Sequence, residues 1–326
     1  MKTVFCPVLC AIALLCTAVT IHAAPRAKIE DRSRTPYMGA IVLDASSGKV
    51  LFEDNADAKI YPASVGKLMN LLVIEDKISS GAVQLTDTIT VTAEVARMGG
   101  SQVYLKEGEV FTVEDLLYAL MVQSANDAAL ALAIHVGGSK DGFVALMNKE
   151  AVRIGMKSTR FASVHGLPPS AGQEPDVSTA RDFSLLALEL CKRAETFKYT
   201  SVKTKPFRAN AGKAFGMQNH NKLLWSFPGS DGLKTGYYKL AGFSIAVTAQ
   251  RDGKRVIACV MGSVDRKLRD AKAAELLTKG FASLGVTAVP SMKPDAAPAE
   301  SDEESEKIDF SQNPALLPPK TQKAEK

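Results

Sequence analysis

Cysteine is scarce in this 326-residue chain beyond its first residues. Cys6, Cys10 and Cys16 fall within an N-terminal apolar run, which leaves Cys191 and Cys259 in the rest of the chain. Two cysteines make no disulfide scaffold. Their pairing is left open, although separate buried thiols are the commoner state in apolar contexts such as that of Cys259.

A strong excess of one charge is also lacking, as is metal-ligand spacing. The net charge is +5, with no basic stripe of the kind that nucleic-acid grooves use. His135, His165 and His220 show no metal-ligand spacing, so core or surface hydrogen bonding is expected for each. There is no phosphate-binding glycine loop and no internal repeat. We therefore expect no cofactor, no metal and no nucleic-acid partner.

A long apolar run occurs at the N-terminus and not again later. Met1-Lys2-Thr3 precedes an apolar stretch and then small residues, the pattern of a secretory signal. Because Pro25 disfavours cleavage after Ala24, we assign residues 1–23 to a signal peptide and 24–36 to a linker. The stretch is short for a bilayer span, so an uncleaved anchor is the minor alternative.

Strand-like segments at both ends of the chain enclose a helical middle. Residues 39–43 and 49–52 predict a hairpin, and Thr112 with Asp115 predicts a capping box. The apolar spacing predicts helices at 67–78, 113–121, 127–135 and 264–284, and strands at 232–238, 242–250 and 255–261. One antiparallel sheet with an inserted helical lobe follows. The acidic, proline-containing segment 287–326 is expected to be disordered.

Three short motifs appear in order: Ser64-Val65-Gly66-Lys67, Ser124-Ala125-Asn126 and Lys234-Thr235-Gly236. Each is weak alone, because Ser46-Ser47-Gly48-Lys49 and Ser311-Gln312-Asn313 fit the first two patterns as well. We reject those copies because one lies in a hairpin turn and the other in the acidic tail, where neither is held rigidly enough for catalysis.

The first motif suits a nucleophile and its base. Ser64 directly precedes an apolar helical run, so we expect it in the first turn of a buried helix. A spacing of three then places Lys67 on the same face, within reach of the hydroxyl proton. The bland alternative is a helix cap beside a solvated lysine.

The other two motifs suit substrate binding. Ser124 and Asn126 interrupt an apolar segment, so their polar groups need partners, although capping of the next helix would also explain them. Lys234 and Gly236 are poorly suited to a strand unless a ligand selects them. Gly236 would let the ligand approach the backbone, and Lys234 would attract its carboxylate. An exposed edge strand is the alternative.

With their flanking residues, the motifs resemble those of the D-alanyl-D-alanine carboxypeptidases, low-molecular-mass penicillin-binding proteins of serine peptidase family S11. The resemblance covers about residues 37–284 and includes these phrases: Tyr61-Pro62-Ala63-Ser64, Gln123-Ser124-Ala125-Asn126-Asp127, His165-Gly166-Leu167-Pro168 and Asp231-Gly232-Leu233-Lys234. It implies an α/β (α+β) fold, with an antiparallel sheet flanked by helices plus an all-helical lobe, and a catalytic domain at 37–286.

The resemblance also implies roles at matched positions. Ser64 would attack the peptide bond between two D-alanines, Lys67 would be the base and Ser124 would relay protons. Asn126 would orient the substrate amide, and Lys234 with Thr235 would hold the terminal carboxylate. Backbone N–H groups of Ser64 and Tyr237, the residue after Gly236, would form the oxyanion hole. His220 is expected to border the cleft.

Two departures and three alternatives accompany this interpretation. Gly66 and Tyr238 stand where relatives often carry threonine, which puts the rate and the substrate preference in doubt. An endopeptidase would use the same groups. A class A-like β-lactamase would need a placed carboxylate, for which Glu174 is a candidate, but we interpret Glu174 as an exposed loop residue. A non-catalytic wall-peptide-binding protein is the third alternative.

The implied partners are peptidoglycan stem peptides ending in D-Ala-D-Ala, with β-lactams as inhibitors. The signal predicts export to the periplasm or to the outer face of the cytoplasmic membrane. Membrane association is left open, although stable insertion through the acidic tail is not expected.

Overall fold

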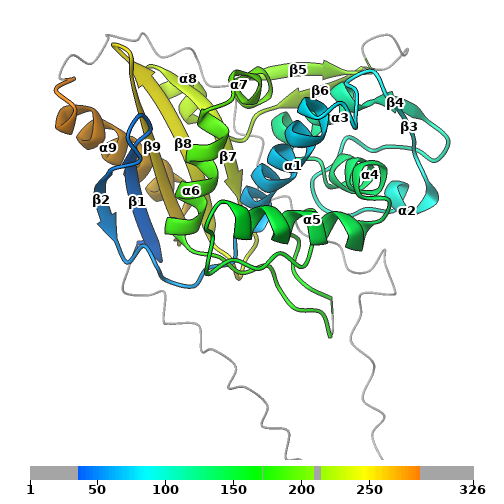
Figure 1. The fold of residues 1–326 in the computed structure, drawn as a ribbon, viewed down its shortest axis with the longest axis horizontal. Helices are drawn as coiled ribbons and strands as arrows, with labels where there is room; N and C mark the ends of the chain where they lie inside the picture. Colours follow the sequence, from blue (N-terminus) through cyan, green and yellow to red (C-terminus); the bar gives the residue numbers. More distant parts are fainter. Residues whose placement is uncertain (1–35, 171, 209–213, 287–326) are drawn as a thin grey trace, which may run out of the picture. The chain divides into compact units, whose positions relative to one another are not determined.

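A five-stranded antiparallel sheet, in the order β2-β1-β9-β8-β7, forms one side of the fold, on the left in Figure 1. The structure, a computed structural model, describes residues 36–170, 172–208 and 214–286. The predicted signal peptide and the predicted acidic tail lie outside these residues. The strands are β1 (Gly39–Asp44), β2 (Val50–Asp54), β7 (Ser230–Gly236), β8 (Phe243–Arg251) and β9 (Lys254–Ser263).

The predicted hairpins are confirmed, and their turn residues explain them. Between β1 and β2, the Asp44 carboxylate accepts hydrogen bonds from Ser46 and Ser47. Between β8 and β9, Asp252 and Gly253 both have positive φ, as a two-residue hairpin turn of right-handed twist requires.

Helices cover both faces of the sheet. On one face, α9 (Arg266–Ser283) buries Leu276, Leu277 and Phe281 against β8 and β9. A glycine at 280 permits this approach, because a Cβ there would lie 2.6 Å from a methyl group of Val256. On the other face, α6 (Ala180–Cys191) contacts β1 and β9. The inner strands β1, β9 and β8 are therefore buried on both sides, which explains their continuous apolar runs, whereas the edge strand β2 is largely exposed.

Much of the chain between β2 and β7 forms the helical lobe. Three of its helices, α1 (Lys67–Ser79), α3 (Val113–Val122) and α4 (Asn126–Gly137), match predicted ones, and the capping box of Thr112 and Asp115 is confirmed. The further helices are α2 (Ala93–Ala96), α5 (Lys140–Arg153), α7 (Ala194–Thr200) and α8 (Leu223–Ser226). The sequence did not predict α5 or α6. The predicted α/β (α+β) class is confirmed.

The lobe expected to be all-helical also contains two small antiparallel sheets. One pairs β3 (Thr88–Thr90) with β4 (Val110–Thr112), and the other pairs β5 (Thr204–Phe207) with β6 (Phe215–Gln218). Strands of three or four residues are too short to show a clear alternating pattern, so the sequence did not predict them.

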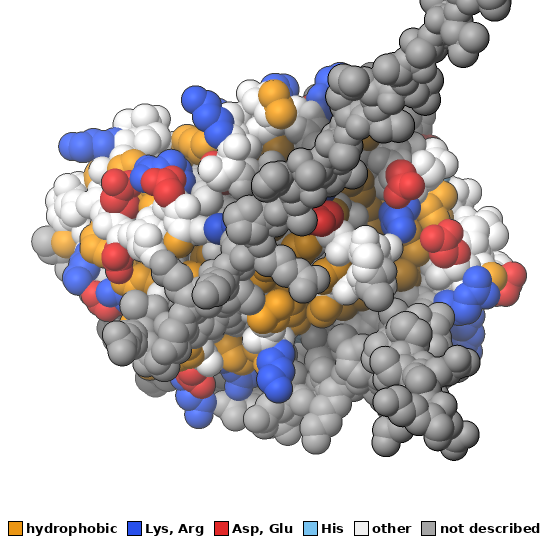
Figure 2. Space-filling model, turned by 90° about the horizontal axis from the view of Figure 1, so that it is seen from below, with side chains coloured by type: hydrophobic (Ala, Val, Ile, Leu, Met, Phe, Trp, Pro, Cys, Tyr) orange, Lys and Arg blue, Asp and Glu red, His pale blue; other side chains and the backbone are white. Residues whose placement is uncertain are grey.

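Charge and hydropathy agree with the sequence interpretation. On the face shown in Figure 2, basic and acidic side chains of the described residues are interspersed among apolar ones. Among the helices that the structure describes, no single one is long and apolar enough to cross a membrane, and only α4 with α5, bent by 83°, passes that test as a pair.

Candidate active site

Ser64 lies in a single 3₁₀ turn, η1 (Ala63–Gly66), directly before α1. The sequence placed it in the first α-helical turn, and the difference follows from the entry to the helix, where Ala63 has a positive φ of 49°. Side chains three residues apart eclipse each other in a 3₁₀ turn. Lys67, the first residue of α1, accordingly brings its Nζ to 2.9 Å from Ser64 Oγ.

Two glycines hold η1 from opposite elements. A Cβ on Gly166, whose φ is +78°, would collide with the Ala63 carbonyl and lie 3.0 Å from Ser64 N. A Cβ on Gly236 would lie 2.7 Å from Val65 N and 2.9 Å from Ser64 N. Gly236 is therefore needed for the packing of β7 against η1, a reason different from the ligand approach that the sequence indicated.

Lys67 is surrounded by acceptors and is 1% exposed. Its Nζ lies 2.7 Å from Asn126 Oδ1 and 3.0 Å from the carbonyl oxygen of His165, in addition to Ser64. Ser124 Oγ is farther away, at 3.4 Å. These partners fix the amine beside the hydroxyl of Ser64, which contradicts the alternative of a solvated lysine.

The second motif is buried at the start of α4. Ser124 and Asn126 are each 2% exposed, and Ser124 has a positive φ of 60°. The N-cap of α4 is Ala125, with no side-chain cap hydrogen bond, so helix capping does not explain this motif. Asn126 also donates through Nδ2 to the Gly99 carbonyl, which fixes the orientation of its amide.

The third motif lies on β7, the edge strand of the sheet. The edge position agrees with the alternative, but the exposure does not, since Lys234 and Thr235 are 2% and 3% exposed. Lys234 Nζ donates to the carbonyl of Thr235 at 3.1 Å. A buried lysine on an edge strand points to a function in this place.

One small cavity brings most of these groups together. It is lined by Ser64, Ser101, Ser124, His220, Thr235, Gly236 and Tyr237. Lys67 and Asn126 reach it through their hydrogen bonds, and Lys234 neighbours Thr235 on β7. The expectation that His220 borders the cleft is confirmed.

Sequence reasoning missed three contributors to this site. Ser101 lines the cavity, donates to the Gln123 carbonyl and accepts from Asn126 N through its own carbonyl. The His165 carbonyl and Gly166 were quoted only as part of a family phrase. The signal for Ser101 was weak, since it follows two glycines in a loop.

The loop that carries His165 is held by a buried carboxylate. Asp176, 8% exposed, accepts hydrogen bonds from Ala162 N, Ser163 N and Ser163 Oγ, at 2.6 to 2.8 Å. Burial raises the pKa of Asp176, and these three donors oppose that rise. The same sequence region that suggested a β-lactamase carboxylate thus positions the loop that contacts Lys67.

Both cleft-side histidines are neutral. Burial, followed by the charge of Lys67, lowers the pKa of His165 to about 3, and burial with Lys234 lowers that of His220 to about 3. His165 Nδ1 accepts a hydrogen bond from Leu167 N. Within the described residues, no three His, Cys, Asp or Glu side chains group as metal ligands would.

The remaining sequence candidates lie elsewhere. Ser46 donates to Asp44 in the hairpin turn, and Ser311 is outside the described residues. Glu174 is 75% exposed and pairs with Arg160, as expected for a loop residue. Cys191 and Cys259 are free thiols.

Comparison with known sequences gives consistent matches. The sequence pattern of the D-alanyl-D-alanine carboxypeptidases, peptidase family S11, matches residues 28–265. D-alanyl-D-alanine carboxypeptidase DacF of Bacillus subtilis is 33% identical over 281 residues, which are 86% of this chain and 71% of that protein. DacC of Escherichia coli is 38% identical over 263 residues, 78% of this chain. The match spans 63% of DacC, less than two thirds of its length.

Solved structures agree. Penicillin-binding protein D2 of Listeria monocytogenes, in its ampicillin-bound form, is 31% identical with a TM-score of 0.67. The match covers 76% of this chain and 97% of that one. Penicillin-binding protein 5 of Haemophilus influenzae, 31% identical over 76% of this chain and 71% of its own, has a TM-score of 0.70.

Proposed function

The chain belongs to the D-alanyl-D-alanine carboxypeptidase family of serine peptidases, and we propose that it removes the terminal D-alanine from peptidoglycan stem peptides through an acyl-enzyme at Ser64. The observation that carries this proposal is the 2.9 Å distance between Lys67 Nζ and Ser64 Oγ at the cavity that Thr235 and Tyr237 also line. A hydroxyl held beside a buried amine is the arrangement of an activated nucleophile.

In the acylation step, the Lys67 amine takes the proton of Ser64 as Oγ attacks the carbonyl carbon between the two D-alanines. The negative charge that develops on the carbonyl oxygen is stabilised by the N–H groups of Ser64 and Tyr237, and such donors typically contribute a factor of ~10²–10³ each. The C–N bond then breaks, and the proton passes through Ser124 to the amine of the departing D-alanine.

Lys234, Thr235 and Asn126 orient the substrate. Lys234 and Thr235 hold the terminal carboxylate, and Asn126 orients the amide on the acyl side. In deacylation Lys67 takes a proton from a water molecule, whose oxygen attacks the ester carbonyl carbon. The bond between that carbon and Ser64 Oγ then breaks, Lys67 gives the proton to Oγ, and the shortened peptide is released.

The endopeptidase alternative uses the same groups and differs in the bond that is cut. The β-lactamase alternative needs a carboxylate beside the ester. The exposure of Glu174 and its ion pair with Arg160 argue against that role. A non-catalytic binding protein has no need for the enclosed Lys67 that this site retains.

The setting of the enzyme completes the proposal. Residues 37–286 form the catalytic domain, and 1–23 direct export to the periplasm or the outer face of the cytoplasmic membrane. β-Lactams, which relatives bind in solved structures, acylate Ser64 and inhibit the enzyme.

Release of D-alanine from a peptide ending in D-Ala-D-Ala tests this function, with Ser64→Ala as the matched variant. We expect release by the wild type alone, and a covalent penicillin adduct on the wild type alone. A folded wild-type protein that forms the adduct but releases no D-alanine would move the assignment to the endopeptidase or to a binding protein.

A further inference from the structure

Near the candidate active site, an exposed aromatic side chain stands on a strained backbone. Tyr104 is 62% exposed, and its φ of +56° lies in the left-handed region that bulky residues rarely adopt. Its ring packs edge to face on Phe215 of β6, with the ring centroids 5.8 Å apart. We call these two rings the aromatic ledge.

The strained positions are not scattered. Among the described residues, six other than glycine have positive φ. Asn55 and Asp252 are of the types that tolerate this conformation, and Ala63 and Ser124 belong to the candidate active site. The remaining two are Tyr104 and Arg208, and the guanidinium of Arg208 donates a hydrogen bond to the carbonyl of Tyr104. Such conformations are strained and cluster at functional sites.

The support beneath Tyr104 is built from buried and paired charges. Arg208 donates to the carbonyls of Val103 and Tyr104, at 2.8 Å each, and is itself held by Glu109. From the other side, the buried Asp127 accepts hydrogen bonds from Val103 N and Leu105 N. Hydrogen bonds therefore hold the backbone on both sides of the tyrosine, and its ring is exposed to solvent.

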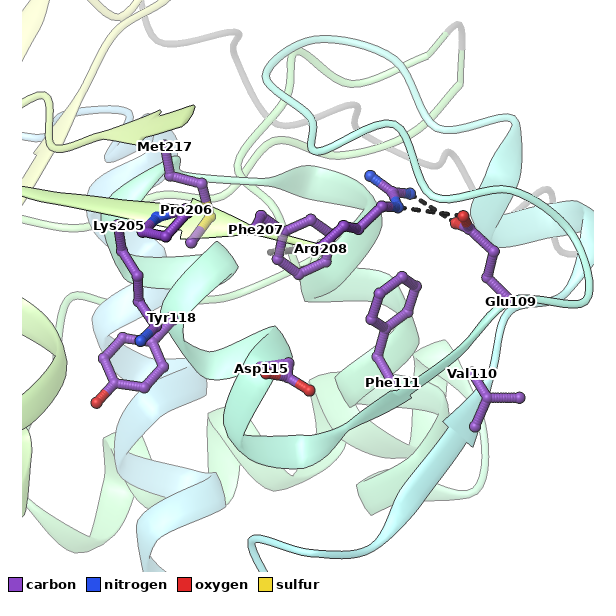
Figure 3. Close-up of a pocket in the computed structure, with 10 residues that line it drawn as sticks. All are labelled: Glu109, Val110, Phe111, Asp115, Tyr118, Lys205, Pro206, Phe207, Arg208 and Met217. Carbon is purple, nitrogen blue, oxygen red and sulfur yellow. Dashed lines mark hydrogen bonds and ion pairs between the residues drawn. The ribbon is translucent and has the colours of Figure 1, made fainter. Parts of the chain in front are cut away.

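A groove of about 620 Å³ adjoins the ledge, between the β5–β6 hairpin and the residues of β4 and α3 (Figure 3). Phe207 pairs across the hairpin with Phe215 and stacks on Phe111, with centroids 4.9 Å apart. Because cross-strand partners share one face of a sheet, Phe215 of the ledge lies on the same face of the hairpin as Phe207, which lines the groove beneath the guanidinium of Arg208. Lys205 Nζ lies 4.1 Å from the ring centroid of Tyr118 at the far end.

The charges of the groove favour an uncharged occupant. Its lining holds two acidic side chains, Glu109 and Asp115, and two basic ones, Lys205 and Arg208, so no net charge remains to attract an ion. The exposed ring of Tyr104, beside a groove with apolar and polar lining, suits a sugar, which has apolar C–H faces and neutral hydroxyl and amide groups. The volume falls within the range of ordinary small-molecule sites.

The ledge and the groove lie close along the chain to residues of the catalytic cavity. Ser101 lines the cavity and Tyr104 follows three residues later, while Met217 lines the groove and His220, three residues on, lines the cavity. Three residues span at most roughly 10 Å. A stem peptide of four or five residues reaches roughly 13–18 Å when extended, enough to join the two places.

We propose, on the basis of the carboxypeptidase function proposed above, that the aromatic ledge and the groove bind the glycan part of the wall substrate, the N-acetylated amino sugars to which the stem peptide is attached. The sugars stack on Tyr104 and extend toward Phe111. The enzyme therefore prefers stem peptides that carry their disaccharide over bare peptides.

The test compares two substrates in the full chain: a short acylated peptide ending in D-Ala-D-Ala, and the same peptide on its disaccharide. We expect Tyr104→Ala to lower kcat/KM for the disaccharide substrate by about tenfold and to leave D-alanine release from the bare peptide, and acylation by penicillin, within twofold. Val110→Arg, at a 55% exposed position of the groove, is expected to act in the same way.

Tyr104→Phe, which keeps the ring, and Val152→Ala, at an 80% exposed position of α5, are the controls and are expected to behave as the wild type. Equal losses on both substrates, or no loss on either, would overturn the proposal. Absence of D-alanine release by the wild type would instead count against the carboxypeptidase function. In that case calorimetric titration with the peptide-free disaccharide decides: weaker binding to Tyr104→Ala than to wild type supports the ledge, and equal or no binding refutes it.

Discussion

Two glycines determine where Ser64 stands, although neither carries a functional group. A Cβ at Gly166 or at Gly236 would lie 3.0 Å or less from backbone atoms of η1. A side chain at either position would therefore push Ser64 away from Lys67. Gly66, by contrast, lies at φ −55°, and a Cβ there would meet only Phe161 at 3.6 Å, an ordinary contact. The space around Gly66 would therefore accept a side chain, and a threonine, as relatives often carry, would meet the ring of Phe161.

We expect Gly166→Ala to slow acylation by penicillin by roughly 10²-fold, because a displacement of about 1 Å at the reacting atoms costs that much. Gly81→Ala is the matched control. It has a similar φ of +74° but no atom within 4 Å, so it introduces the same backbone strain without the collision. The second-order rate constant of acylation is the measurement. Equal rates in the two variants would show that the contact with Ala63 does not position Ser64.

At the scale of elements, the site is assembled where η1, α4, β7 and the loop at 162–166 meet. The start of α1 contributes Lys67, the start of α4 contributes Asn126, and the edge strand β7 contributes Lys234. Asp176 fixes the loop that returns the His165 carbonyl to Lys67. Each element supplies one or two groups, which explains why the three motifs are far apart in the chain.

The start of α3 tests how much one helix end contributes. Thr112 accepts from Asp115 N at 3.1 Å, and Asp115 accepts from Thr112 N in return. We expect Thr112→Ala to lower the free energy of unfolding by about 1 kcal/mol, because the backbone N–H of Asp115 loses its acceptor, whereas the N–H of residue 112 keeps the Asp115 carboxylate. Thr112→Ser keeps the cap and should lose little. Chemical denaturation measures both, and an unchanged midpoint for the alanine variant would contradict the assignment. Acylation by penicillin should be unaffected.

At the scale of the whole molecule, a buried carboxylate couples stability to pH. Glu75 of α1 is 7% exposed, accepts hydrogen bonds from Thr196 of α7 and lies 3.7 Å from Arg193. Burial raises its pKa from 4.5 to about 7, although Thr196 and Arg193 oppose the rise. Between these two pH values the folded protein holds a proton that the unfolded chain has released.

Stability therefore falls as pH rises from about 4.5 to about 7, by roughly 3 kcal/mol from this group. Glu75→Gln removes this contribution, so the difference in unfolding free energy between wild type and variant should change by that amount across the window. Glu107→Gln, at an exposed position, serves as the control. Denaturant unfolding at several pH values measures the difference, and a difference that is constant with pH would refute the burial argument.

The sequence alone predicted much of the local structure and the candidate reacting groups. Strand-like apolar runs between turns predicted the five strands of the sheet, and helical spacing predicted α1, α3, α4 and α9 but not α5 or α6. The three motifs, with their flanking residues, indicated Ser64, Lys67, Ser124, Asn126 and Lys234 before any geometry was known.

Tertiary structure alone decided what those groups contact. Packing against η1 is a further reason for Gly236, which also lines the cavity, and the neighbour that forbids a side chain there, Val65, comes 171 positions earlier in the chain. The edge strand is buried at Lys234, which the sequence did not predict. No periodic pattern in the sequence indicated the contact of the His165 carbonyl, the short strands or the strained backbone of Tyr104. Contacts between distant segments depend on how separate elements pack, and no local pattern records that.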